Sequence, residues 1–246
     1  MASSNTTIDM RQVLSLIEVR THYYNLLRQL FLSEPTEQLL LEIKESMIFK
    51  EFPFQDSNPL LQKGCMLAAE AMESYDSRRK QDFEDLHWDY TRMFVGPYEL
   101  PAPPWASAYS GDGRLLFQNE TQQIRKAYAK YGFQLKNFGS EAEDHIGYEL
   151  DFMYRLTKET ASLLEREEFG KAQSCIRDQI IFIEQHLFSW IPSFRKEMET
   201  AAHMPFYKGV AAVLEGALQL DRLLLNELSE FLLLSVNTKT EVTEDV

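Results

Sequence analysis

The sequence contains few of the residues from which common catalytic and metal sites are built. Its 246 residues include two cysteines, Cys65 and Cys175, which stand far apart and form no Cys-x-x-Cys pair. A zinc knuckle and a redox dithiol are therefore not indicated, and both cysteines are expected to be buried, because each sits beside apolar residues on a helical pattern. No His-x-x-x-His pair, Gly-x-Ser-x-Gly elbow or phosphate-binding Gly-x-x-x-x-Gly-Lys loop occurs. These absences disfavour a metal hydrolase, a serine hydrolase and a P-loop nucleotide site.

Long apolar runs and an excess of basic charge are also missing. No apolar run approaches the roughly 18 to 20 residues needed to cross a bilayer, and residues 1–9 lack the features of a signal peptide. We therefore expect a cytoplasmic protein that is not an integral membrane protein. The formal net charge of −13 repels phosphate backbones, so no nucleic-acid partner is expected. The acidity either attracts basic segments or serves solubility alone.

Helical periodicity dominates the chain, while strand alternation, βαβ spacing and solenoid repeats are absent. The pattern predicts helices over residues 13–30, 39–47, 59–75, 80–94, 121–131, 140–164, 171–188 and 206–234, with Pro192 and Pro205 interrupting the region between the last two. The predicted fold is all-α: a single multi-helix globular domain over residues 1–236, with a long loop between its halves. Residues 237–246 are polar and are expected to form a disordered tail.

That loop, residues 95–109, is the most informative segment. Its fifteen residues include four prolines, two tyrosines and a tryptophan. Proline fixes its own φ and restricts the preceding residue to extended geometry, so the loop loses little entropy when it presents its rings in a fixed pose. Such a segment suits recognition better than catalysis, because almost none of its side chains transfers a proton.

The helix before this loop places Trp88 and Arg92 on its polar face, with Glu84 and Asp85. Two interpretations of the tryptophan stay open. In one, the aromatic loop covers Trp88 and Arg92 stacks on its ring as a cation–π pair. In the other, Trp88 faces a ligand.

An acidic segment, residues 141–145, lies at the start of the helix predicted over residues 140–164. Ser140 followed by Glu143 is typical of a capping box, and carboxylates at this end complement the helix dipole. His145 and Glu149 are four residues apart, which is consistent with a buried hydrogen-bonded pair. Alternatively, Asp144 and His145 form an anionic pocket at the start of the helix. A further alternative is a metal- or nucleotide-dependent helical enzyme that uses Asp144, His145 and Glu149.

Three segments carry a family resemblance. Tyr90–Pro97 with Pro101–Tyr109, then Glu141–His145, and finally Leu187–Trp190 with Met204–Tyr207 resemble the TorD/DmsD family of twin-arginine leader-binding chaperones for molybdoenzymes. The middle segment is similar to the family signature Glu-Pro-x-Asp-His, with Ala142 in place of the proline. The resemblance covers about residues 86–207.

The resemblance implies an all-helical fold, no catalytic turnover and no cofactor of the protein's own, since the molybdopterin belongs to the client. The implied partners are a twin-arginine leader and the catalytic subunit of a molybdopterin oxidoreductase, held in the cytoplasm for cofactor insertion before export. A homodimer formed by segment exchange is compatible with it, as is a chaperone that binds the client's folded body. The expected peptide-binding residues are Trp88, Arg92, Phe94, Gly96, Pro97, Pro104, Trp105, Ser107, Tyr109, Glu143, Asp144 and His145.

Overall fold

The computed structural model describes residues 9–110, 119–135 and 142–244, and throughout these ranges helices form the framework. They are α1 (Met10–Leu32), α2 (Glu37–Ser46), η1 (Gln55–Ser57), α3 (Pro59–Ser74), α4 (Lys80–Phe94), η2 (Ala106–Tyr109), α5 (Asn119–Lys130), α6 (Ile146–Glu165), α7 (Phe169–Phe182), the π-helical segment η3 (Ile183–Leu187), α8 (Phe188–Ala201) and α9 (Pro205–Glu244). No strand occurs within the described ranges. The all-α prediction is confirmed.

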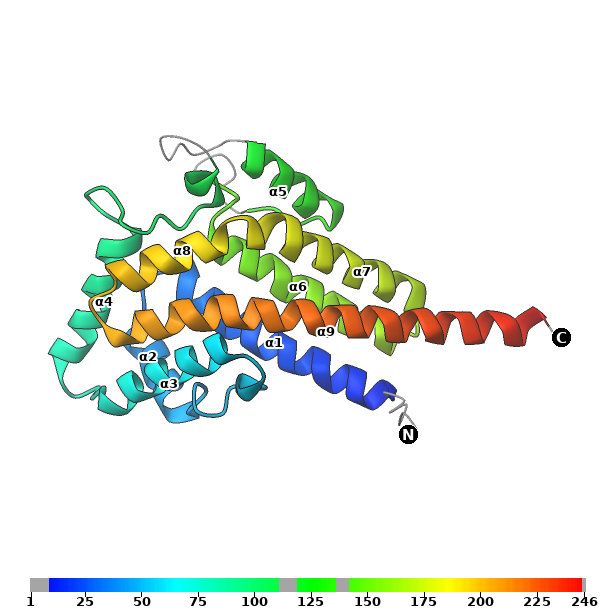
Figure 1. Ribbon diagram of the computed structural model, residues 1–246, viewed down its shortest axis with the longest axis horizontal. Helices are drawn as coiled ribbons and strands as arrows, with labels where there is room; N and C mark the ends of the chain where they lie inside the picture. Colours follow the sequence, from blue (N-terminus) through cyan, green and yellow to red (C-terminus); the bar gives the residue numbers. More distant parts are fainter. Residues whose placement is uncertain (1–8, 111–118, 136–141, 245–246) are drawn as a thin grey trace.

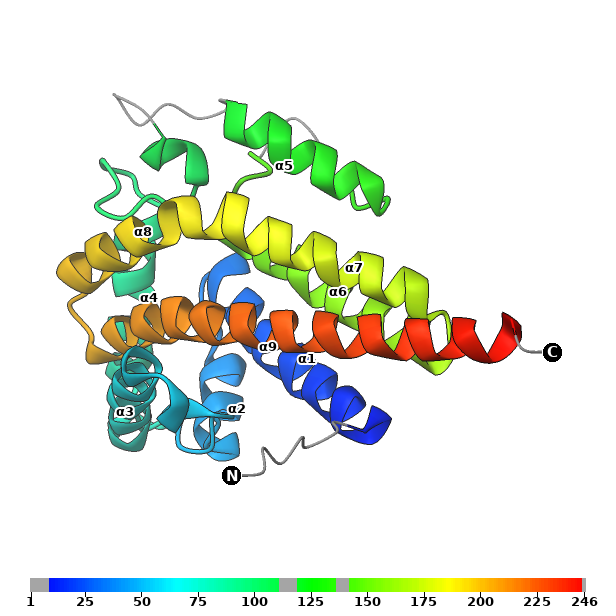
Figure 2. The ribbon, with the colours of Figure 1, turned by 45° about the vertical axis from the view of Figure 1, so that its right-hand side comes forward.

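Helix α9 is the central element of the bundle (Figure 1). It runs the length of the molecule, and α3, α7 and α8 pack along it, while α1 packs against α6. Helices α2, α3 and α4 gather at the end where α9 begins, and α5 lies on the outer side of α7 (Figure 2). The chain therefore places the α4–α5 loop and the start of α6 on the same side of the bundle as α8.

Glycine allows α3 and α9 to approach backbone to backbone. A Cβ built on Gly64 would lie 2.6 Å from the amide nitrogen of Val213, and one on Gly209 would lie 2.6 Å from that of Ala68. Such distances leave no room for a side chain, so these positions require glycine. This close contact fixes how α3 crosses the first half of α9.

A buried polar cluster joins α1 to α7 and α9. The carboxylate of Asp221 accepts hydrogen bonds from Arg20 (2.5 Å) and from the hydroxyls of Tyr23 and Tyr24, and Arg20 also donates to Gln179 at 2.7 Å. The Arg20 and Asp221 side chains are both fully buried. A buried charge pair requires this geometry to offset its desolvation, so the cluster specifies how the three helices are aligned.

Several predicted helix ends are confirmed. Asn58 caps α3, its side chain accepting from the amides of Leu60 and Leu61, and Pro59 occupies the first helical position as expected. Helix α4 spans Lys80–Phe94 as predicted. Both cysteines are buried and free.

Other helix boundaries were predicted wrongly. Helix α6 begins at Ile146 with His145 as its N-cap, instead of at the proposed capping box, whose Ser140 lies outside the described residues. Pro192 lies inside α8, where the π-helical segment directly upstream shifts the hydrogen-bond register, so the proline does not end the helix.

The predicted end of the last helix at Leu234 was also too early. Helix α9 continues to Glu244, into the segment expected to be a disordered tail. No glycine or proline follows Gly216, so nothing in the local sequence breaks the helix after its apolar periodicity fades.

Candidate functional site

The Pro/aromatic loop and the segment before α6 meet in a short antiparallel bridge between Trp105 and His145. The amide of Ile146 donates to the carbonyl of Pro104 at 2.9 Å. The Trp105 ring and the His145 imidazole are steeply inclined to each other, at 72°, with ring centroids 5.5 Å apart. Two segments far apart in sequence are thus joined directly to each other.

Asp144 holds this junction together from inside. Its carboxylate accepts hydrogen bonds from the amide of Ser107 (2.7 Å) and the hydroxyl of Thr121 (3.0 Å), and its carbonyl accepts from Ala106 at 3.0 Å. The residue has no exposed surface. Asp144 therefore positions η2 and the start of α5, and both of its carboxylate oxygens are hydrogen-bonded before any ligand arrives.

His145 is the N-cap of α6, and its Nδ1 accepts a hydrogen bond from the amide of Gly147 at 3.1 Å. Burial lowers the pKa of this imidazole to about 4, so it is neutral at physiological pH. Its ring also lies beside that of Tyr148. His145 acts here as a structural acceptor whose ring packs against Trp105.

The predicted hydrogen-bonded pair of His145 and Glu149 was wrong. Glu149 has no exposed surface, and within the described part of the chain neither of its carboxylate oxygens has a hydrogen-bond partner. Burial, and then the nearby charge of Asp144, raise the pKa of Glu149 well above its ordinary value. The indole of Trp190 offsets part of this shift without forming an aligned hydrogen bond.

The aromatic side chains of the loop divide between core and surface. Tyr109 packs against Trp190, with ring centroids 5.4 Å apart, and its hydroxyl donates to Glu197 at 2.9 Å. Phe94 is buried against Phe194 and is a core residue. Phe94 is therefore less accessible to a peptide than its place in the motif suggested.

The tip of the loop is the most exposed part of the candidate site. Gly96 has a φ of 110°, which favours glycine, and the Gly96–Pro97 peptide bond is cis. Tyr98 is 87% exposed and Val95 is exposed as well. Tyr98 was not among the predicted site residues, although its place between prolines was a visible signal.

The predicted stacking of Arg92 on Trp88 was wrong. The Arg92 guanidinium donates to Asp89 and to the carbonyl of Ala201, each at 2.5 Å. Trp88 is 62% exposed, so the loop does not cover it. The interpretation of Trp88 as a ligand-facing ring therefore agrees with its exposure.

Asp89 is a residue that the sequence analysis missed. Its buried carboxylate accepts from the amides of His203 (2.9 Å) and Met204 (2.7 Å), in addition to Arg92. These bonds hold the α8–α9 turn against α4. The only signal in the sequence was an aspartate on the apolar side of a helix.

Glu143 lies next to the bridge and faces α5. It is 2% exposed, it pairs with Arg125 at 2.7 Å, and its carbonyl accepts from the hydroxyl of Tyr128 at 3.1 Å. The structure thus brings together the predicted residues Pro104, Trp105, Ser107, Glu143, Asp144 and His145, with Tyr109 following on η2. Direct contact with a peptide remains a prediction for every one of the predicted site residues.

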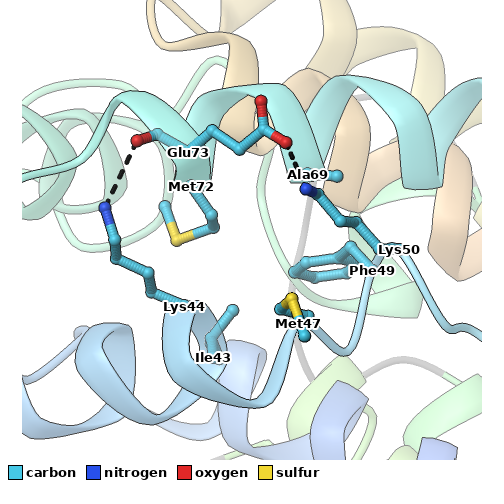
Figure 3. Close-up of a pocket in the computed structure, with 8 residues that line it drawn as sticks. All are labelled: Ile43, Lys44, Met47, Phe49, Lys50, Ala69, Met72 and Glu73. Atoms are coloured by element: carbon cyan, nitrogen blue, oxygen red, sulfur yellow. Dashed lines mark hydrogen bonds and ion pairs between the residues drawn. The ribbon is translucent and has the colours of Figure 1, made fainter.

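A separate apolar groove lies between α2 and α3 (Figure 3). Met72, Phe49 and Ile43 form its floor, and two lysines stand at its rim. Lys44 donates to the carbonyls of Glu73 (3.2 Å) and Tyr75, and Lys50 forms an ion pair with the Glu73 carboxylate. These lysines are therefore already engaged, and none of the predicted site residues lines this groove.

Over the described ranges, no cluster of three or more His, Cys, Asp or Glu side chains has the geometry to hold a metal ion. In the same part of the chain, no helix combines the length and apolar character of a membrane span.

Comparison with known proteins adds independent information. Residues 58–196 match the family described as the nitrate reductase delta subunit. The chain is 26% identical over 212 residues to the chaperone protein TorD of Photobacterium profundum, covering 86% of this chain and 96% of the relative. It is also 26% identical over 219 residues to TorD of Vibrio cholerae serotype O1 (strain El Tor Inaba N16961), covering 89% and 97%. A crystal structure of a redox enzyme maturation protein from Archaeoglobus fulgidus matches with a TM-score of 0.41 and 17% identity, covering 87% of this chain and 98% of that one.

The family match spans the aromatic loop, the bridge and the start of α6, and the matched relatives are chaperones rather than enzymes. The resemblance inferred from the sequence motifs is thereby confirmed. The chain belongs to the nitrate reductase delta subunit family, together with the TorD chaperones.

Proposed function

We propose that this chaperone binds the twin-arginine leader of a molybdopterin oxidoreductase and holds the apo form of that catalytic subunit until its cofactor is inserted. In this proposal, binding takes place in the cytoplasm before export, and the molybdopterin is bound by the client alone. The observation that carries the proposal is the Trp105–His145 bridge, which joins a stiff ring-bearing loop to an acidic helix start.

The chemistry of such a leader fits this surface. A twin-arginine leader carries two adjacent cations beside an apolar segment. The exposed rings of Trp88 and Tyr98 offer apolar area to the apolar segment, and the net charge of −13 attracts the arginines over a longer range. Proline-rich geometry preorganises the loop, so little conformational entropy is lost on binding.

Isothermal titration of the full chain with a synthetic leader peptide tests this proposal. We expect saturable binding at micromolar concentrations, weakened at high salt because the arginine contacts are screened. Trp88→Ala and Trp105→Ala are expected to lower the affinity, whereas Met66→Ala, which removes an exposed apolar side chain from α3, should leave it unchanged. Absence of binding up to tens of micromolar would refute leader recognition.

A client without its leader separates this proposal from a chaperone that recognises only the folded body. Leader recognition predicts that deletion of the leader abolishes most of the binding. Unchanged binding of the truncated client would assign recognition to the body and would reject the bridge as the principal site.

A further inference from the structure

A cavity of about 450 Å³ lies between α5 and the segment that precedes α6. Tyr128, Phe133 and Leu135 give it apolar walls, Ala129 contributes from α5, and Arg125 and Glu143 stand at its polar side. This volume falls within the range of about 300–1,000 Å³ that is usual for ligand sites. Helix α5 lies on the outside of the bundle in both views (Figures 1 and 2).

Glu143 supplies this cavity with an unused hydrogen-bond acceptor. Its Oε1 accepts from Nε of Arg125 at 2.8 Å and from the terminal nitrogen of the same guanidinium at 2.7 Å. Its Oε2 is buried and has no hydrogen-bond partner among the residues that the structure describes. Buried carboxylate oxygens are normally paired, because desolvation without a donor is costly. An N–H donor inside the cavity would complete the coordination of this carboxylate.

The electrostatic surroundings favour a cationic donor. Tyr128 lies within electrostatic range of Asp144 as well as Glu143. Asp144 takes its two side-chain hydrogen bonds from uncharged groups, so its negative charge has no cationic partner among them. The Arg125 side chain is 44% exposed, whereas that of Glu143 is 3% exposed, so the ion pair lies at the solvent edge of the cavity on the arginine side.

Phe133, which lines the cavity, already contacts the guanidinium of another arginine. Arg155 lies over the ring of Phe133, with its guanidinium carbon 4.8 Å from the ring centroid, and it pairs with Asp151 at 3.1 Å. An aromatic face combined with a carboxylate is a common binding arrangement for arginine, because the planar guanidinium stacks and donates in the same plane. The cavity offers the same combination in Tyr128, Phe133 and Glu143.

We propose that this cavity binds one arginine side chain of the client's leader, with Glu143 Oε2 as its acceptor and the walls of Tyr128 and Phe133 against its stem. The inference rests on the proposed function and assigns the charge recognition to Glu143. Asp144, whose oxygens are bonded to η2 and α5, holds the cavity in shape instead.

A double-mutant cycle tests the assignment. The leader peptide and a variant with both arginines replaced by glutamine are titrated into the full chain and into Glu143→Gln. We expect Glu143→Gln to weaken the arginine peptide about tenfold, the equivalent of one charge-assisted hydrogen bond, and to leave the glutamine peptide unchanged. Glu165→Gln, which removes an exposed carboxylate from α6, is the matched control and should leave both affinities unchanged.

Ala129→Phe provides a second test that leaves the Arg125–Glu143 pair intact. The added ring would fill the cavity from α5, so the arginine peptide should again bind about tenfold more weakly. Thermal unfolding of each variant checks that the fold is retained, and Ala129→Phe decides the question if Glu143→Gln does not fold.

The outcomes separate the two proposals. Leader binding that is lowered equally for both peptides, or unaffected by both variants, would overturn the arginine site and leave the proposed function standing. No leader binding by the unmodified chain would overturn both. A leaderless client that competes for the cavity would place the arginine in the body of the client and would also refute the assignment.

Discussion

Substitution of Asp144 tests whether its carboxylate binds the ligand directly or stabilises the folded structure. In Asp144→Ala, the amide of Ser107 and the hydroxyl of Thr121 would lose their acceptor in a buried environment. Hydrogen bonds to a charged group contribute about 1.5–3 kcal/mol each. Because the two share one acceptor, we expect a total loss of roughly 2–4 kcal/mol, which corresponds to a melting temperature lower by roughly 4–16 °C for a chain of this size.

The isosteric variant Asp144→Asn makes the test specific. Its amide oxygen can still accept from Ser107, and its NH2 can donate to the Thr121 hydroxyl, so the melting temperature should fall much less than in the alanine variant. Differential scanning calorimetry measures stability, and limited proteolysis of residues 95–110 reports on the loop. We expect leader affinity to follow loop protection: reduced in Asp144→Ala and largely kept in Asp144→Asn.

One result would refute this reasoning. If Asp144→Asn loses leader affinity as completely as Asp144→Ala, while its stability and loop protection stay unchanged, the negative charge itself contacts the ligand. Asp144 would then be a direct contact, and the role assigned to Glu143 would have to be given up.

The other predictions concern stability and are measured by urea or thermal unfolding. Asp221→Ala leaves Arg20 buried without its counter-ion, so we expect a loss of about 3–5 kcal/mol; a loss below about 1 kcal/mol would contradict this account. Gly209→Ala forces a Cβ into the α3–α9 contact and should cost about 1–3 kcal/mol, whereas the control Gly170→Ala, with nothing within 4 Å, should be neutral or slightly stabilising. Because the pKa of Glu149 is raised in the folded state, the unfolded chain releases this proton first as pH rises past about 4.5, and stability falls. Glu149→Gln removes that penalty. Its melting temperature should therefore be higher than that of the unmodified chain near pH ~7 and the same as that of the unmodified chain near pH ~4. A lower melting temperature of the variant at pH ~7 would show that the buried carboxylate is stabilised by a partner.

Helix formation and its main boundaries were readable from local sequence. The apolar spacing in α4 and the Asn58–Pro59 start of α3 act through near neighbours, so they hold in any helical tertiary context. The start of α6 was misread because the capping signal at Ser140 competes with a contact from elsewhere in the chain. The bridge from Trp105 holds His145 in extended geometry, and the helix begins only after it.

The roles of individual site residues were less predictable. Asp144 and Glu143 are neighbours of the same charge, yet one is bonded to η2 and α5 while the other faces a cavity with a free oxygen. Side-chain direction depends on which segments pack around them. Asp89 and Tyr98 were missed for the same reason, since burial in one and exposure in the other are set by distant parts of the chain.

The sequence by itself determined an all-helical chain, a stiff aromatic loop, an acidic segment and the family to which these belong, because periodicity, proline and short motifs act over a few residues. Only the tertiary structure decided that the loop and the acidic segment form one surface, that Asp144 supports it from within and that Glu143 is left with an unsatisfied oxygen. Those outcomes depend on burial and on contacts between segments far apart in sequence, which no local pattern records.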